Sequence, residues 1–332
     1  MEDLLPRLMT FVREQPWALT PEKHVTLVDI LRFRNAGGRL NREEIAARIG
    51  PRAERPRDQF LDLATDQLYA ERFDGEGQSL GFLAASGAPL KPGQAGVIAV
   101  ISVLGIIAQR ASEVDDISGP GATSIEKLTN RFRSARDDAS VRATVFDFDS
   151  PGGGVYGVQE LADEIRAARG TKPMVSVANS LAASAAYWLA SAADEVSVVP
   201  SGEVGSIGVY GAHEDLSGML EKEGVKVTLI SAGKFKVEGN PFEPLSEDAR
   251  AYWQARVDEY YDAFAGGVAK SRGMPRSKVE KDFGQGRVVG AKAALEAGMV
   301  DRIETLDHPG LKRRLHHREP AARARRSSCP RP

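Results

Sequence analysis

The sequence predicts an α/β fold, a mostly parallel sheet with helices on both faces. The first observation is that apolar runs of strand length alternate with amphipathic helical segments between residues 96 and 303. Such alternation with short links is typical of parallel strands joined by crossover helices. The second is that Gly-rich turns follow several of these runs. The third is a composition of 42% hydrophobic and 27% charged residues, which is that of a soluble globular protein.

The expected elements follow in order. We expect strands at residues 96–104, 141–148, 173–178, 196–199, 207–210, 225–230 and 299–303. Helices are expected at residues 124–135, 155–169, 184–192, 216–223 and 246–269, with a helical pair from residue 277. Thr123 or Ser124 and Ser246 are side chains that cap helix starts.

The chain divides into four parts by composition. Leucines at helical spacing and the helix start at Thr20-Pro21 predict a helical arm at the N-terminus. The C-terminal end is rich in arginine and poor in apolar residues, which predicts disorder. The expected parts are a helical arm at 1–75, a linker at 76–95, an α/β domain at 96–305 and a basic disordered tail at 306–332.

Charge and cysteine content exclude several classes of protein. A net charge of −2 gives no argument for specific nucleic-acid binding. Cys329 is the single cysteine, so a disulfide framework within the chain is impossible and a reducing compartment is expected. The N-terminus lacks the order of a signal peptide, and the apolar run at 97–108 is too short for a membrane anchor. We therefore expect a cytoplasmic protein, with no cofactor and no metal.

A short apolar run at 174–178 leads into a segment of small residues that contains Ser184. This order predicts that Ser184 lies at a strand-to-helix switch, near the first turn of a buried helix. Unpaired N–H groups at a helix start stabilise negative charge. Considered alone, the segment fits a packing helix with an incidental serine better than a catalytic one.

Two Gly-rich turns are further candidates. Asp149-Ser150-Pro151-Gly152-Gly153-Gly154 follows a predicted strand but lacks the spacing of a phosphate-binding loop. Its N–H groups could form an oxyanion hole, although a plain tight turn explains it equally well. Ser206 lies between glycines in the second turn and is either a loop residue or a catalytic helper.

A serine nucleophile needs a base, because its hydroxyl is weak unaided. Lys234 and Lys236 flank Phe235 after the predicted strand at 225–230, and a lysine in an apolar site loses its proton more easily. His213, followed by acidic residues, is the rival base. A solvated lysine and a structural histidine are the ordinary explanations of these residues.

Five motifs in order resemble the signal peptide peptidase A (protease IV) family of serine peptidases, within the Clp protease and crotonase fold superfamily. The motifs are 149–153, 181–187, 204–209, 235–242 and 286–301, and the resemblance covers residues 97–303. It implies a Ser–Lys dyad with Ser184 as nucleophile and Lys236, not Lys234, as general base. Ser206 would orient the lysine, and Gly152 or Gly153 with Ala185 would form the oxyanion hole.

The chain departs from this family in two respects. Ala185 and Ala186 stand where the family usually has two glycines, which narrows the approach to the nucleophile. The membrane anchor of cellular members is absent, so we expect none here.

A narrower likeness is to the phage head maturation (prohead) proteases. It rests on Gln15-Pro16-Trp17-Ala18, the loop at 118–124 and the stretch at 236–244. It implies a homo-oligomeric endopeptidase that cuts scaffold, portal or capsid proteins in the host cytoplasm, inside the prohead. The chain ends too soon after Asp301 to include a fused scaffold segment, so we expect a separate scaffold. The alternatives are a cellular signal-peptide-peptidase-like enzyme, an inactive shell component and a crotonase-like acyl-CoA enzyme.

Overall fold

A computed structural model provides the coordinates of the chain. The residues that it describes are 17–19, 58–62, 67–73, 79–84, 97–110, 122–139, 141–308, 310, 311, 314 and 315. The helical start expected at Thr20-Pro21, the loop at 118–121 and the last residues of the basic tail lie outside them.

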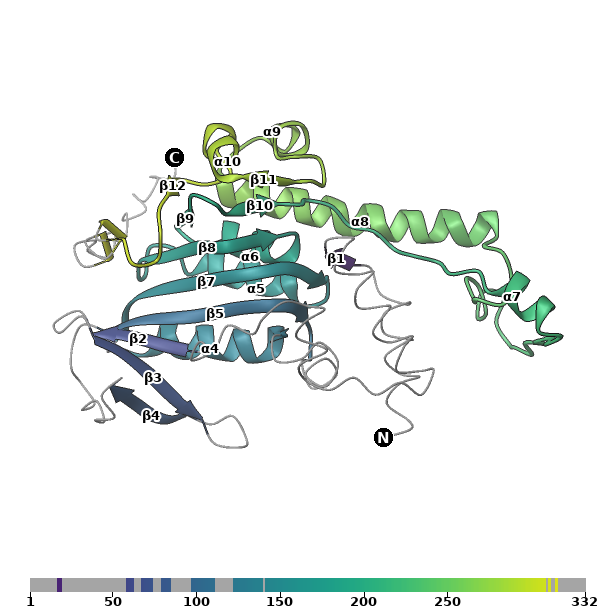
Figure 1. Cartoon of the computed structure of the whole chain (residues 1–332), viewed down its shortest axis with the longest axis horizontal. Helices are drawn as coiled ribbons and strands as arrows, with labels where there is room; N and C mark the ends of the chain where they lie inside the picture. Colours follow the sequence, from purple (N-terminus) through teal and green to yellow (C-terminus); the bar gives the residue numbers. More distant parts are fainter. Residues whose placement is uncertain are drawn as a thin grey trace, which may run out of the picture.

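A parallel sheet forms the centre of the molecule and confirms the predicted fold class. Strand β7 pairs in parallel with β5 on one edge and with β8 on the other, and β8 continues in parallel to β9 and β10. The order across the sheet is β11-β10-β8-β7-β5-β2-β3-β4 (Figure 1). The central strands are β5 (Val97–Ala108), β6 (Thr123–Ser124), β7 (Val141–Gly154), β8 (Met174–Ala183), β9 (Glu195–Val198) and β10 (Glu203–Gly205).

Antiparallel strands extend this sheet where we expected a helical arm and a linker. These strands are β1 (Trp17–Leu19), β2 (Asp58–Asp62), β3 (Gln67–Phe73) and β4 (Ser79–Ala84). Strand β2 pairs with β5, and β3 and β4 follow by antiparallel pairing. The prediction was wrong for these residues because the charged residues masked an alternation of period two, as in Leu80, Phe82 and Ala84.

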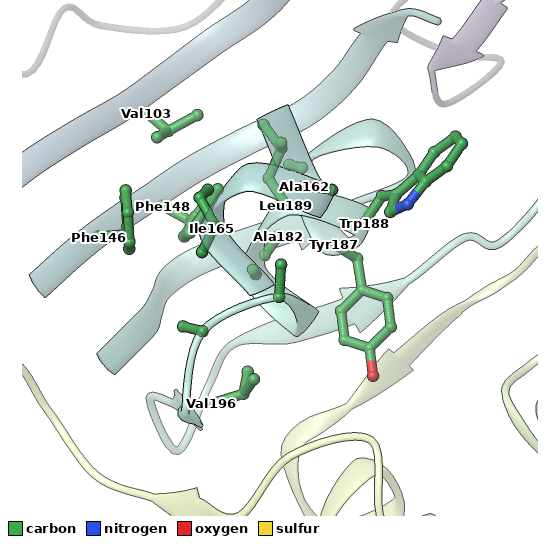
Figure 2. Packing of buried hydrophobic residues seen from close by; sticks show 14 of the residues in the cluster. Val103, Phe146, Phe148, Ala162, Ile165, Ala182, Tyr187, Trp188, Leu189 and Val196 are labelled. Atoms are coloured by element: carbon green, nitrogen blue, oxygen red, sulfur yellow. The ribbon is translucent and has the colours of Figure 1, made fainter. Parts of the chain in front are cut away.

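Helices cover one face of the sheet. Helices α4 (Ile125–Asp137), α5 (Val158–Ala167) and α6 (Ala185–Ser191) pack against alternate residues of the central strands. Figure 2 shows the core beneath α6, where Phe146 and Phe148 of β7 face Ile165 and Leu189. Helix α8 (Glu247–Arg272) runs along the outside of this layer and continues beyond it (Figure 1).

The opposite face is covered by residues near the C-terminal end. Val100, Val145 and Val177 form a second core cluster with Leu311 and Leu315, whose exposed fractions are 1% and 4%. Residues 310, 311, 314 and 315 are helical. The packed body therefore includes part of the segment that we expected to be a disordered tail from residue 306, because its leucines fill an apolar face of the sheet.

Buried ion pairs fix this C-terminal segment. Arg314 contacts Glu195 at 2.7 Å and also pairs with Glu304. Burial would raise the pKa of Glu304, but its hydrogen bonds with Arg314 and Ser197 outweigh burial and hold the pKa below its ordinary value.

The remaining elements follow β10 in the chain. They are α7 (Ser217–Lys222), α9 (Arg276–Asp282), β11 (Val288–Gly290), α10 (Ala291–Ala297) and β12 (Arg302–Ile303). Strand β11 pairs with β10, and β12 pairs in parallel with β9. The expected strand at 225–230 is wrong, because these residues are irregular and exposed. The expected strand at 207–210 is also wrong, since β10 ends at Gly205. In the described part of the chain, no helix is long and apolar enough to cross a membrane.

Candidate active site

Ser184 occupies the junction between β8 and α6, as the sequence predicted. It is the N-cap residue of α6, with φ 55° and ψ −123°. A positive φ is unfavourable for a residue with a side chain and persists only where the surroundings enforce it. Here Ser184 is the single residue between the end of β8 at Ala183 and the start of α6 at Ala185, and it is 1% exposed.

Backbone contacts hold Ser184 while its hydroxyl stays unpaired. Its N–H donates to the carbonyl of Gly205 at 2.6 Å, and its carbonyl accepts from the N–H of Trp188 at 3.0 Å. Its buried Oγ has no hydrogen-bond partner among the described residues. A buried hydroxyl without a partner is costly, so an arrangement that preserves one points to a functional group.

The loop that contains Ser206 supports Ser184 directly. Gly205 and Ser206 both have positive φ, at 107° and 52°, and Gly205 provides the acceptor for Ser184. The N–H of Ser206 donates to the carbonyl of Arg287 at 2.8 Å. Ser206 therefore directly follows Gly205, whose carbonyl holds the N–H of Ser184. In the described part of the chain, the Ser206 side chain forms no hydrogen bond with Ser184 Oγ.

The glycine segment 149–154 lies beside Ser184 at the carboxyl end of the sheet. The expected tight turn is wrong, because this segment is extended and forms the end of β7. Ser150 of β7 pairs in register with Ala182 of β8, two residues before Ser184. A Cβ atom on Gly153 would come within 1.8 Å of the carbonyl oxygen of Ile107, so only glycine fits there. The structure therefore brings the glycine segment and the predicted nucleophile to one place.

The N–H groups of the expected oxyanion hole differ in whether they already have a hydrogen-bond acceptor. Ser150 Oγ accepts from the N–H of Gly152 at 3.2 Å and donates to the carbonyl of Gly105 at 2.6 Å. Ala185 is the first residue of α6, so its N–H has no acceptor within the helix. Of the expected oxyanion-hole donors, Gly152 already has an acceptor, whereas Ala185 is at a helix start.

Lys236 is not brought to Ser184 within one chain. It is exposed, and its segment packs at the N-terminal end of α8, where Gly239 lies against Trp253. The ring of Phe264, further along α8, stacks on Trp188 of α6 at 4.7 Å. Eleven residues of helix separate Trp253 from Phe264, or about 16 Å along the axis. Figure 1 shows the segment around α7 beyond the end of the sheet.

His213 and Lys234, the alternative bases, lie in the same outlying part. His213 Nε2 is 2.9 Å from the carbonyl oxygen of Asn240, and the His213 ring packs edge-on against Trp253. Lys234 lies over the ring of Phe235 at 4.7 Å from its centroid. Both residues have contacts of their own, and neither hydrogen-bonds Ser184 Oγ.

Two supports of α6 were not found from the sequence. The Tyr187 hydroxyl donates to the carbonyl of Met299 at 2.8 Å, and burial raises the pKa of this tyrosine. Figure 2 shows Tyr187 and Trp188 leaving α6 in different directions, so the helix is anchored on two sides. Arg169 holds the other end of α6 through carbonyl groups. A single arginine after a helix gives no signal of this in the sequence.

A parallel α/β sheet with an unpaired serine hydroxyl at a strand-to-helix junction, next to a glycine segment, defines a hydrolase-like class of fold and site. Residues 166–314 match the family model of peptidase family S49. This confirms the resemblance inferred from the sequence motifs.

Several relatives share this similarity. Capsid assembly protease C of Escherichia phage lambda is 35% identical over 245 residues, which are 72% of this chain and 55% of that protein. Head-tail preconnector protein GP5 of Enterobacteria phage P21 is 35% identical over 206 residues, 62% of this chain and 40% of that protein. Serine protease SPPA, chloroplastic, of Arabidopsis thaliana is 32% identical over 189 residues, which are 56% of this chain and 28% of that protein. The chain spans about half the length of the two phage relatives.

Proposed function

We propose that the protein is a serine endopeptidase that cuts peptide bonds through an acyl-enzyme on Ser184. The observation that carries the proposal is the unpaired, buried Oγ of Ser184 at a positive-φ junction beside the glycine segment of β7. Attack by this oxygen on a peptide carbonyl would create an oxyanion next to the start of α6. The N–H groups of Ala185 and Gly153 would stabilise this oxyanion, and Gly152, with its positive φ, would shape the end of β7.

Lys236 is the proposed general base, and its position requires a second copy of the chain. In one chain it is on the exposed segment at the end of α8, away from Ser184. The same segment exposes apolar side chains, with Ile230 at 96%, Phe235 at 55% and Met219 at 54%. Such a cluster of exposed apolar residues favours a protein interface. We infer a homo-oligomer in which Lys236 of one copy reaches Ser184 of the next, with Ser206 orienting the lysine.

In the proposed reaction, neutral Lys236 accepts the Ser184 proton as Oγ attacks the substrate carbonyl. The lysine then gives that proton to the leaving amine and afterwards activates the water that hydrolyses the acyl-enzyme. An apolar interface around the lysine would favour its neutral form, because burial penalises the charged form.

The proposed substrates are head proteins of a virus, namely scaffold, portal or capsid proteins. The support comes from the printed names of the two phage relatives, which refer to capsid assembly and a head-tail preconnector. The host cytoplasm, within the assembling head, is the corresponding location. Preferential cleavage of head proteins over unfolded casein would test this substrate class.

Coexpression of two inactive variants tests the shared active site. Ser184→Ala and Lys236→Ala should each abolish casein cleavage when expressed alone, whereas Lys234→Ala should leave it intact. Coexpressed Ser184→Ala and Lys236→Ala chains should recover about a quarter of the wild-type rate, because random assembly joins both intact residues at about one interface in four. Activity of the Lys236→Ala variant alone would refute the dyad, and absence of recovery would refute its division between copies.

A further inference from the structure

The edge of β7 beside Ser184 is occupied by another part of the same chain. Pairing between β7 and β8 ends at Ser150 and Ala182, where β8 turns away toward Ser184. The residues of β7 beyond that point still have β5 on their other edge, with Ile107 opposite Gly153. Strand β1 takes the edge that β8 leaves, and pairs antiparallel with the glycine segment at the end of β7.

The register places β1 at the level of the nucleophile. Leu19 is opposite Gly152, and Trp17 is opposite Gly154. Counting two residues onward from the Ser150–Ala182 pair gives Gly152 on one strand and Ser184 on the other. The strand therefore runs from Gly154 back toward the nucleophile, and Leu19 is its residue at the level of Ser184.

An extended segment that adds to an exposed strand edge is the way in which many peptides bind to proteins. Resting on the function proposed above, we propose that Trp17–Leu19 is an internal ligand of the peptidase site. It lies in the place of a peptide substrate, and a protein substrate must displace it. The surroundings fit an inactive state, because Ser184 Oγ has no hydrogen-bond partner among the described residues and Lys236 lies on the exposed segment at the N-terminal end of α8.

Full-length variants that weaken β1 test the proposal. In the double variant Ala18→Pro, Leu19→Pro, one of the two prolines removes an N–H that points toward β7, because alternate N–H groups of an antiparallel strand face the partner strand. The loss of one backbone hydrogen bond corresponds to about a five-fold change in an equilibrium. The matched control, Ala18→Val, Leu19→Ile, keeps both N–H groups and favours an extended backbone.

Two probes separate this inference from the proposed function. A small fluorophosphonate needs only a reactive Ser184, whereas a diphenyl phosphonate that carries an Ala–Leu peptide also needs the strand edge. We expect the proline variant to react about five-fold faster than wild type with the peptidyl probe, with an unchanged rate for the small probe. The Val/Ile control should behave as wild type with both, and Ser184→Ala should react with neither.

The outcomes are distinguishable. If the small probe labels Ser184 and the peptidyl probe reacts equally with wild type and the proline variant, the internal ligand is refuted and the peptidase remains. If the small probe labels no variant at Ser184, the proposed function fails, and the inference with it. Hydrogen exchange on the unmodified chain gives a second measurement. Reaction with the peptidyl probe should speed exchange in a peptic fragment covering residues 15–22, and unchanged exchange would overturn the proposal.

Discussion

Replacing Arg169 should destabilise the protein through the helix that begins at Ser184. The Arg169 guanidinium donates to the carbonyls of Ser191, Ala192 and Ala193, at 2.8, 2.8 and 2.6 Å, where α6 ends. It also donates to the carbonyl of Ser271, at 2.7 Å, in the last turn of α8. Burial lowers the pKa of Arg169, because the buried guanidinium loses part of its hydration.

The magnitude follows from these four bonds. Helix carbonyls at a C-terminal end have no partners within their own helix, so Arg169→Met leaves them unpaired. A hydrogen bond to a charged group contributes about 1.5–3 kcal/mol, but burying the arginine offsets a part of the sum. We therefore expect a loss of about 3 kcal/mol, a large share of the roughly 5–15 kcal/mol that stabilises a typical domain. Arg169→Lys should recover only a part, since an ammonium cannot span the planar arrangement of a guanidinium.

Urea denaturation followed by circular dichroism measures the effect. For a domain of this size, a loss of about 3 kcal/mol lowers the midpoint by about 1 M urea with an unchanged slope. Arg166→Met is the matched control, because Arg166 forms an exposed pair with Asp163, which is worth about 0.5 kcal/mol or less. Equal midpoints for the Arg169→Met and Arg166→Met variants would refute the reasoning.

Two further predictions concern α8 and its end. Gly267→Ala should destabilise the protein by about 1–3 kcal/mol, because the new Cβ would meet Trp188 Nε1 at 2.5 Å, whereas Gly266→Ala meets nothing and should stabilise it by up to about 1 kcal/mol in the same urea titration. Burial would raise the pKa of Asp301, but its hydrogen bonds with Arg272 outweigh burial and lower the pKa below the ordinary 3.8. Stability from this pair is therefore complete above pH 3.8 and lost as the pH falls through the lower folded-state value, so Asp301→Asn should show a shallower acid-side loss of thermal midpoint than wild type.

The centre of the fold was predictable because its signals are local. The helix face of Ile125, Leu128 and Phe132 and a cap at Thr123 or Ser124 are predictable from spacing alone, and α4 has this face with Ser124 as the cap. The antiparallel strands β2 to β4 were missed although β3 pairs with both of its neighbours in the chain, because charged residues mask their alternation of period two. The expected strand at 225–230 failed for a different reason, since its β-branched residues pair with no strand in the described part of the chain.

The site was predictable in its residue types and less so in its geometry. The sequence placed Ser184 at a strand-to-helix junction, and this position is confirmed. It predicted a tight glycine turn after a strand, whereas residues 149–154 are the end of strand β7 itself. It could not show that Lys236 is remote from Ser184 in one chain, because spacing along the chain contains no information on the direction in which α8 extends. Nor could it show that β1 pairs with Gly152–Gly154, a contact between residues more than a hundred positions apart.

The two halves of the proposed dyad differ in what holds them. Ser184 is fixed within the core, since Gly205 binds its N–H and Trp188 its carbonyl, and these bonds offset a backbone strain of about 1–3 kcal/mol. Lys236 lies on an exposed segment whose apolar side chains include the exposed Ile230 and Phe235. In the proposed enzyme, folding prepares the nucleophile and association of copies would deliver the base. A peptidase divided in this way should show a specific activity that rises with protein concentration, which would keep a single chain inert until copies are brought together.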